Sequence, residues 1–345
     1  MLYDLLKNDF KLSENYKYDF IIIGSGPAGI TIARKLASSG KFVALIEGGG
    51  FEGSPESYDI YKGKVLGDKY LNLQSCRLRY FGGTSNHWQG MSRNFEEIDF
   101  DRGYLGNEYK WPIKITDLTK YQFEASNILE IENEFNEFKI NNSNFKSISF
   151  HNSYVNFRDK YFDEIKKSKN IHLFLNANFK DLGGDMRKIE FVNLESFNRD
   201  TLKIFGKDIV FCMGGIENSR FLLWIEKKHD NKFFDKDLPI GKYWMEHPHF
   251  TLGKIIAAQS KFPYRNLSLE GEVQKRLKIL NCGIRINWSR EKRSTKKLVK
   301  DLLCQAPNIG KKFAKLLGRN LICEATIRSA WEQAPNINNK ISLDS

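Results

Sequence analysis

Cysteine is scarce in this chain of 345 residues, and the few cysteines form no recognisable pattern. There are five, an odd number, and no two of them have C-x-x-C spacing. Disulfide frameworks and structural zinc sites both require such patterned cysteines. The sequence therefore argues against both and favours a reducing compartment, for which we expect the cytoplasm. The cysteines are Cys76, Cys212, Cys282, Cys304 and Cys323.

Long apolar runs are also missing. No stretch approaches the roughly 18 consecutive apolar residues of a transmembrane helix. Charges interrupt the first twenty residues, which contain no h-region of a signal peptide. We therefore expect neither a membrane span nor a secretory leader. The hydrophobic share of 41% and the charged share of 28% are ordinary for a globular protein, and the length accommodates about two domains.

Signatures of nucleic-acid-binding modules are absent, so we expect no nucleic-acid partner despite the formal net charge of +12. Part of this charge is concentrated in residues 291–320, which contain nine lysines and arginines against two acids. Their apolar spacing predicts two short amphipathic helices joined at Pro307. The segment is either a solvated helical hairpin or a basic face that contacts an acidic surface.

Residues 18–47 have the pattern of one βαβ unit. Four apolar residues, Phe20 to Ile23, predict a buried parallel strand, and a helix-period run follows and ends at Gly40. A second apolar strand covers Phe42–Ile46. Three glycines in G-x-G-x-x-G spacing stand between the first strand and the helix. This order of elements is typical of dinucleotide-binding folds.

Each glycine of this turn has a physical role in such a site. Gly24 permits the tight turn, Gly26 lets the backbone approach a pyrophosphate, and Gly29 allows close helix–strand packing. The helix N-terminus faces the negative charge. Glu47 follows Gly29 by 18 residues, where a carboxylate accepts hydrogen bonds from a ribose diol and repels a 2′-phosphate. The unit predicts dinucleotide binding; the alternative is a Gly-rich turn without a ligand.

A second glycine segment, residues 77–91, reads RLRYFGGTSNHWQGM. Gly82 and Gly83, followed by Thr84 and Ser85, supply a flexible backbone, hydroxyls and N–H groups. Such a segment suits a loop that wraps around phosphates or a ring system.

Three further patterns lie downstream. Asn170–Phe179 alternates as a strand would, and Ile209–Met213 predicts a buried strand that ends at Gly214–Gly215 before a helical pattern. From Phe250 onward, short alternating segments predict an antiparallel sheet.

With these segments the sequence resembles the glucose–methanol–choline (GMC) family of FAD-dependent oxidoreductases. Members place a G-G-[ST]-[ST] loop against the flavin after an N-terminal FAD fingerprint, as GGTS stands here after residues 18–47. The likeness continues in the family's order through WPI at 111–113, DIVFCMGGIENSRFLL at 208–223, IGKYWMEHP at 240–248 and EQAPN at 332–336.

The resemblance implies an α/β fold. A Rossmann-type FAD-binding domain with a parallel sheet would be joined to an α+β substrate domain with an antiparallel sheet, whose C-terminal part is missing. The implied FAD-binding domain is discontinuous, over 17–110 and 165–250, and the incomplete substrate domain covers 111–164 and 251–345. The implied reaction oxidises the CH–OH group of a small alcohol or sugar, with hydride transfer to N5 of FAD.

The resemblance also assigns the cofactor-binding residues. Phe179 lies where the family's backbone contacts the adenine, although its side chain is more simply a core residue. Asn86, His87 and Trp88 are closest to sugar-oxidising members related to pyranose oxidases and gluconate dehydrogenases. Two roles stay open for His87: a covalent bond to the flavin, as in pyranose oxidases, or packing and hydrogen bonding at the flavin edge. The implied set is Gly24, Gly26, Gly29, Glu47, Gly82, Gly83, Thr84, Ser85, Asn86, His87, Phe179, Gly214 and Gly215.

The catalytic residues are not identified. The family's base is a His paired with a second His or Asn, and the later H-x-x-G-t and N-P-t motifs that carry this pair do not occur here. His247 and His249 match a structural turn instead, and their H-P-H spacing with Glu246 suits no common metal-ligand pair. We therefore expect no metal site, and the chain resembles an N-terminal portion that stops before the catalytic pair.

Three interpretations stay open. The first is a GMC-type oxidoreductase, the second a non-catalytic remnant or fragment that retains the cofactor fold, and the third another two-domain flavoprotein such as a monooxygenase. The GGTSNHW and GGIENSRFLL blocks argue against the third.

Overall fold

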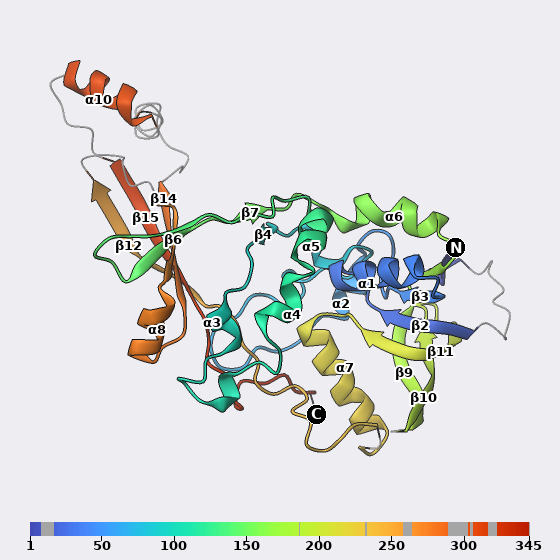
Figure 1. Ribbon diagram of the computed structural model, residues 1–345. Coiled ribbons are helices and arrows are strands. Elements are labelled where there is room, and N and C mark those ends of the chain that lie inside the picture. The colour runs from blue at the N-terminus through green and yellow to red at the C-terminus, as the bar shows by residue number, and fades with distance from the viewer. Residues whose placement is uncertain are drawn as a thin grey trace. The chain divides into compact units, whose positions relative to one another are not determined.

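The chain forms two compact units in the computed structural model, each built around its own large sheet (Figure 1). Unit 1 comprises Met1–Gly90, Tyr154–Tyr243 and Ile337–Ser345, and unit 2 comprises Met91–Ser153 and Trp244–Asn336. The structure describes residues 1–7, 17–185, 187–231, 233–257, 264–288, 303, 306–316 and 323–344.

Unit 1 contains a seven-stranded sheet of order β1-β8-β3-β2-β11-β10-β9. Neighbours from β1 to β11 are parallel, and β10 and β9 are added antiparallel. Its strands are β1 Leu2–Asp4, β2 Lys17–Ile23, β3 Val43–Ile46, β8 Ile171–Leu175, β9 Asn178–Asp185, β10 Lys188–Glu195 and β11 Thr201–Phe211. The predicted Rossmann-type parallel sheet is confirmed.

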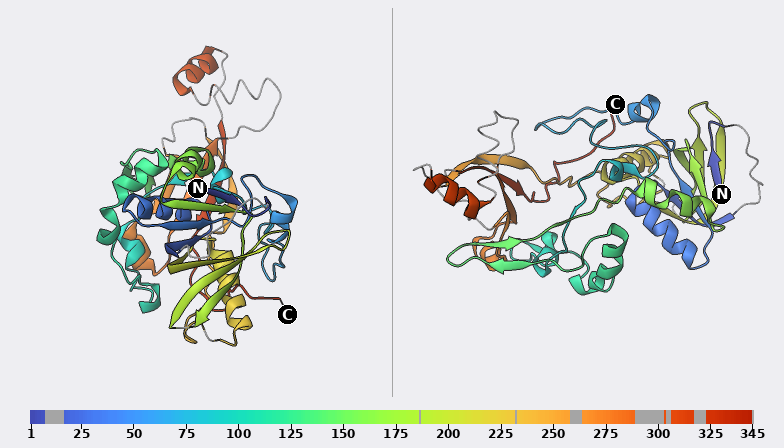
Figure 2. Two further views of the ribbon diagram at one scale, coloured as in Figure 1. Left: turned by 90° about the vertical axis from the view of Figure 1, so that its right-hand side faces the viewer. Right: turned by 90° about the horizontal axis from the view of Figure 1, so that it is seen from above.

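Helices cover this sheet. α1 (Pro27–Ser38) connects β2 to β3 and packs beside α6 (Phe157–Lys167), as Figure 2 shows. α7 (Gly215–Lys228) follows β11. Alternate residues of β2, Ile21 and Ile23, share one core with Phe221 and Ile225 of α7. The remaining helical segments of unit 1 are α2 Pro55–Asp59 and the 3₁₀ turn η1 Gly83–Asn86.

Unit 2 contains a six-stranded antiparallel sheet of order β12-β15-β14-β13-β6-β5, which confirms the predicted second sheet. Its strands are β5 Glu137–Lys139, β6 Phe145–Ile148, β12 His249–Ala257, β13 Asn266–Leu269, β14 Cys282–Trp288 and β15 Cys323–Trp331. The other elements are β4 Met91–Ser92, β7 His151–Asn152, α3 Glu97–Phe100, η2 Asn107–Tyr109, α4 Ile115–Thr119, α5 Gln122–Leu129, α8 Gly271–Leu277 and α10 Pro307–Leu316.

The units are discontinuous, as the predicted domains are, but their boundaries differ. Residues from Met91 onward belong to unit 2 because β4 pairs with β7 and Glu96 binds Lys146 of β6. The final residues belong to unit 1, where the amide of Ile341 donates to the carbonyl of Gly241. These contacts do not test which unit binds FAD and which the substrate, so that assignment stays a prediction.

Two predicted elements are divided in the structure. The alternating segment 170–179 forms β8 and the start of β9, because Asn176 adopts a left-handed conformation (φ +53°) that ends the first strand. The helical pattern near Leu118 forms α4 and α5. In the basic segment 291–320, the second predicted helix is α10, and the first lies outside the described residues except for Leu303 and Ala306.

None of the described helices combines the length and the apolar character that a bilayer crossing requires.

Candidate functional site

In the turn between β2 and α1, two of the three glycines are packed too tightly to accommodate a side chain. Gly24 has a φ of +104°, and a Cβ there would lie 2.5 Å from the carbonyl oxygen of Cys212. A Cβ at Gly29 would lie 1.8 Å from the carbonyl oxygen of Gly24. Protein packing alone therefore requires glycine at both positions, as the sequence analysis expected for the turn and for helix packing.

Gly26 is different. Its φ of −73° suits any residue. Apart from its chain neighbours and the backbone of α1, none of the described residues has an atom within 4 Å of the place that its Cβ would occupy. The first N–H groups of α1, including those of Ala28 and Gly29, have no partner within the helix. Since the protein itself does not require glycine here, the open space in front of the helix N-terminus is available to a ligand.

The loop of residues 82–87 lies directly against this turn. The amide of Gly82 donates to the carbonyl of Ser25 over 3.0 Å, and a Cβ at Gly83 would lie 2.9 Å from the Cα of Gly26. Both glycines have positive φ, +90° and +54°. The two glycine motifs, more than fifty residues apart in the sequence, thus form one surface.

Polar side chains of this loop hold the loop itself. Thr84 accepts from the amide of Leu78, and Ser85 donates to the carbonyl of Gly82 over 2.6 Å. The Asn86 amide group donates to the carbonyls of Phe81 and Gly83. Its Oδ1 is buried and has no hydrogen-bond partner in the described part of the chain. An acceptor so placed points to a donor on a ligand.

His87 ends η1, and its amide donates to the carbonyl of Thr84. The His87 side chain is exposed. Trp88, next along the chain, is fixed: its indole donates to the carbonyl of Val155 over 3.1 Å and packs edge-on to Phe157. Trp88 therefore anchors the loop one residue after His87, whose imidazole is accessible.

Glu47 is buried at the end of β3 and faces the turn. Its Oε2 accepts hydrogen bonds from the amide and hydroxyl of Ser25, and its Oε1 accepts from the amide of Gly49 over 2.9 Å. The carboxylate thus ties β3 to the glycine turn. A carboxylate oxygen can accept two hydrogen bonds, so Oε1, which accepts one, keeps capacity for a ribose hydroxyl.

The third predicted segment meets the same turn from β11. The amide of Cys212 donates to the carbonyl of Ile23, and the Asn218 side chain accepts from the amide of Met213. Gly214 (φ +83°) precedes α7 and, like Gly26, has open space around its missing Cβ. Burial raises the pKa of the Cys212 thiol, which keeps it protonated and unreactive. The end of β11 therefore meets the glycine turn, as the Gly82–Gly83 loop does.

Sequence reasoning missed an ion-pair cluster that braces this region. Glu217, in the first turn of α7, is 4% exposed and accepts from Arg77 over 2.9 Å and from Arg220 over 2.6 Å. The Arg77 guanidinium also lies 4.0 Å from the ring centre of Tyr61. Arg77 and Glu217 are 140 residues apart, so no local pattern signals the pair.

Phe179 and Arg79 border a cavity of about 600 Å³ within unit 1. The cavity is lined by residues of α2, β9, α7 and the turn between β10 and β11. The Phe179 side chain is buried against Phe211 and Phe221, as expected of a core residue. Arg79 donates to Asn178 over 2.8 Å. Its guanidinium lies where a Cβ on Gly48 would be, so it packs directly behind Glu47.

The remaining histidine motif lies in unit 2. His247 is exposed and contacts Glu246 over 3.3 Å, and its ring centre lies 4.9 Å from that of His249. Among the described residues, no group of three or more His, Cys, Asp or Glu side chains is arranged to hold a metal ion.

Comparisons with known proteins give partial likenesses. No protein-family model matches the chain. Patulin synthase of Penicillium expansum is 46% identical over 86 residues, which are 25% of this chain and 12% of that protein. The match thus spans about an eighth of the relative's length.

Solved structures match over most of the chain at low identity. Pyridoxine 4-oxidase from Mesorbium loti is 14% identical, with a TM-score of 0.49, over 93% of this chain and 72% of that one. An arginine variant of formate oxidase from Aspergillus oryzae RIB40, examined for FAD modification, is 15% identical, with a TM-score of 0.49, over 97% and 76%.

Proposed function

We infer that the chain belongs to the glucose–methanol–choline family, and we propose that unit 1 binds FAD as part of an oxidoreductase that acts on CH–OH donors. The observation that carries the proposal is the meeting of three glycine segments at the N-terminus of α1. They are separate in the sequence: the pattern of the first predicts dinucleotide binding, and the other two are assigned to the cofactor by their resemblance to the family.

The residues present fit FAD. Gly26 and Gly214 leave the helix N-termini of α1 and α7 open, which suits a pyrophosphate. Glu47, at the end of β3, suits a ribose diol and disfavours a 2′-phosphate. The buried Oδ1 of Asn86 lacks a donor, and a bound cofactor would supply one.

Bound FAD would supply the hydride acceptor for oxidation of the substrate's carbinol carbon. The chain's own residues bind and orient it. The N-terminus of α1 would stabilise the phosphates, Glu47 would accept hydrogen bonds from the ribose, and the loop from Gly82 to His87 would hold the rest of the cofactor. No residue described here is assigned the role of the base.

A reduction assay tests the proposal and separates it from its alternatives. Protein purified with its flavin is mixed anaerobically with a panel of alcohols and sugars, without NAD(P)H, and the absorbance near 450 nm is followed. Bleaching by a polyol supports the oxidoreductase. Flavin that none of the panel reduces favours the non-catalytic remnant, and flavin reduced by NAD(P)H alone favours a monooxygenase.

We propose a cofactor contact for His87 as well, because its exposed imidazole follows directly on the loop that meets the α1 turn. Acid precipitation distinguishes the two roles of this residue. Yellow colour that stays in the pellet, and is absent from the His87→Ala variant, indicates a covalent bond. Colour released to the supernatant indicates a contact at the flavin edge.

We also propose that the protein is cytoplasmic and that α10 contacts an acidic surface there. Ile309, Phe313 and Leu316 are exposed at helical spacing, next to Lys312 and Lys315. The free thiols of Cys76, Cys212 and Cys282 agree with a reducing compartment. Co-sedimentation with anionic but not neutral vesicles supports the surface; equal recovery with both contradicts it.

A further inference from the structure

One face of the six-stranded sheet in unit 2 carries two adjacent arginines. Arg285 of β14 and Arg328 of β15 are directly opposite each other in the antiparallel register. Thr251 of β12 is opposite Arg328, and Asn266 of β13 is opposite Arg285. We call these four residues the arginine row.

The arginine row lies on the polar face of the sheet. Ile284 and Ile286, which flank Arg285 on β14, point the other way and belong to the apolar core of unit 2, as does Ala325, three positions before Arg328 on β15. Two positions along on the same face, the pair Asn287 and Thr326 is polar as well. The row thus offers hydrogen-bond donors from four neighbouring strands.

Two like charges directly opposite on neighbouring strands repel each other. Neither guanidinium forms an ion pair with a carboxylate in the described part of the chain. Among the described residues, Arg285 donates only to the thioether of Met91, over 3.3 Å, and its buried Nε has no partner. Burial and the charges of Arg265 and Arg328 lower the pKa of Arg285.

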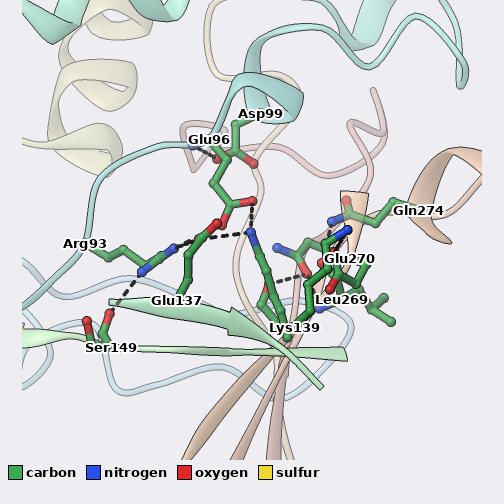
Figure 3. A network of polar contacts seen from close by, with 12 residues as sticks. Arg93, Glu96, Asp99, Glu137, Lys139, Ser149, Leu269, Glu270 and Gln274 are labelled. Atoms are coloured by element: carbon green, nitrogen blue, oxygen red, sulfur yellow. Dashed lines mark hydrogen bonds and ion pairs between the residues drawn. The ribbon is translucent and has the colours of Figure 1, made fainter. Parts of the chain in front are cut away.

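On the same face of the sheet, a second group of cationic side chains is neutralised by carboxylates of the protein itself. Lys146 of β6 lies 2.7 Å from Glu96 and 3.1 Å from Glu137. Arg93 binds the same two carboxylates, and Figure 3 shows Arg93 beside Glu96 and Glu137. Within one sheet, then, one cationic cluster is paired internally and the arginine row is not.

We propose that the arginine row binds the oxyanion of a small molecule, a carboxylate or a phosphate. Guanidinium groups match such groups through paired N–H donors. An oxyanion would remove the repulsion between Arg285 and Arg328 and would provide the acceptor that Nε lacks.

Calorimetric titration of the full chain at low ionic strength tests this inference with three related alcohols. Glycerol is neutral, glycerate carries a carboxylate, and glycerol 3-phosphate carries a phosphate. We expect at least one of the anions to bind and glycerol not to bind, and the tighter anion identifies the oxyanion. Equal binding of all three, or of none, overturns the inference.

Variants locate the site. Arg285→Gln and Arg328→Gln are each expected to weaken anion binding at least tenfold. Arg276→Gln, on α8 in the same unit, is the matched control and should leave binding unchanged. Unaltered affinity in the first two variants overturns the assignment.

Thermal unfolding measured without ligand shows whether the variants are folded. Arg328→Gln should have a midpoint equal to or above that of the original chain, because the repulsion is removed. A lower midpoint would identify the row as a structural element and overturn the inference. FAD content in the same samples keeps the two proposals distinguishable: anion binding without FAD contradicts only the proposed function, and FAD without anion binding contradicts only the arginine row.

Discussion

At the scale of single residues, two glycines of the turn before α1 differ in whether the packing of the protein itself requires glycine. A Cβ on Gly29 would collide with a backbone carbonyl that cannot move aside, whereas a Cβ on Gly26 would enter open space. The two positions look equivalent in a sequence motif. The structure assigns only one of them to protein packing.

Substitution by alanine should therefore give opposite results at these positions. Gly29→Ala is expected to lower the free energy of unfolding by about 3 kcal/mol, because overpacking forces the backbone to shift. Gly26→Ala, at the N-cap of α1, should cost less than about 1 kcal/mol and reduce FAD binding more than tenfold. Urea denaturation and flavin absorbance measure the two effects, and a Gly26→Ala variant destabilised as much as Gly29→Ala would refute this division of roles.

His172 is a buried group whose charge state affects stability. It is 3% exposed and shares a 2.7 Å hydrogen bond with the Tyr18 hydroxyl. Burial, aided by the positive N-terminus, lowers the pKa of His172 to about 4 from its ordinary 6.5. The folded state therefore binds fewer protons than the unfolded state between these values.

Stability contributed by neutral His172 is complete above pH 6.5 and is lost as the pH falls toward 4. The loss should approach about 3 kcal/mol over this window. Urea denaturation at pH 7, 5 and 4 should show a smaller decline in His172→Gln than in the original chain. The half-exposed His151 provides the control, since His151→Gln should decline like the original. Parallel declines in all three proteins would contradict the account.

At the scale of elements, the ion pair between Arg77 and Glu217 connects α7 to the segment that precedes the Gly82–Gly83 loop. Removing one partner of a buried pair leaves the other charge uncompensated. In this cluster Arg220 still contacts Glu217, which reduces the penalty.

We expect Arg77→Leu to lower the free energy of unfolding by about 2 kcal/mol. Hydrogen exchange should quicken in the first turn of α7 and in η1, with little change in unit 2. Arg34→Leu, which removes a more exposed pair with Glu164, should cost less than 1 kcal/mol. Equal effects of the two substitutions would indicate that Arg77 has no bracing role.

The sequence predicted correctly those elements whose formation depends on residues close together in the chain. The run from Phe20 to Ile23, the glycine turn and the helix ending near Gly40 are encoded within thirty residues, and they form as expected. The division at Asn176 was not predicted, because nothing in an alternating pattern reveals a left-handed residue.

Predictions were weakest where distant segments meet. Glu47 was predicted as a ribose ligand from its spacing, but its bonds to Ser25 and Gly49 depend on how β3 meets the turn. The Arg77–Glu217 pair and the arginine row likewise require the register of segments that are remote in the sequence.

At the scale of the whole molecule, two units with separate cores each present a polar surface with unsatisfied groups. Unit 1 has open glycines and the buried Oδ1 of Asn86, and unit 2 has the arginine row. We propose that the first surface binds a dinucleotide and that the second binds a small oxyanion.

Titration of the flavin-free full chain with FAD tests the central claim most directly, with tryptophan fluorescence as the readout and Gly26→Ala as the comparison. The account predicts saturable binding of one FAD per chain, with an affinity at least tenfold weaker in the variant. A folded chain that binds no FAD, or that binds it equally well with alanine at position 26, would contradict it.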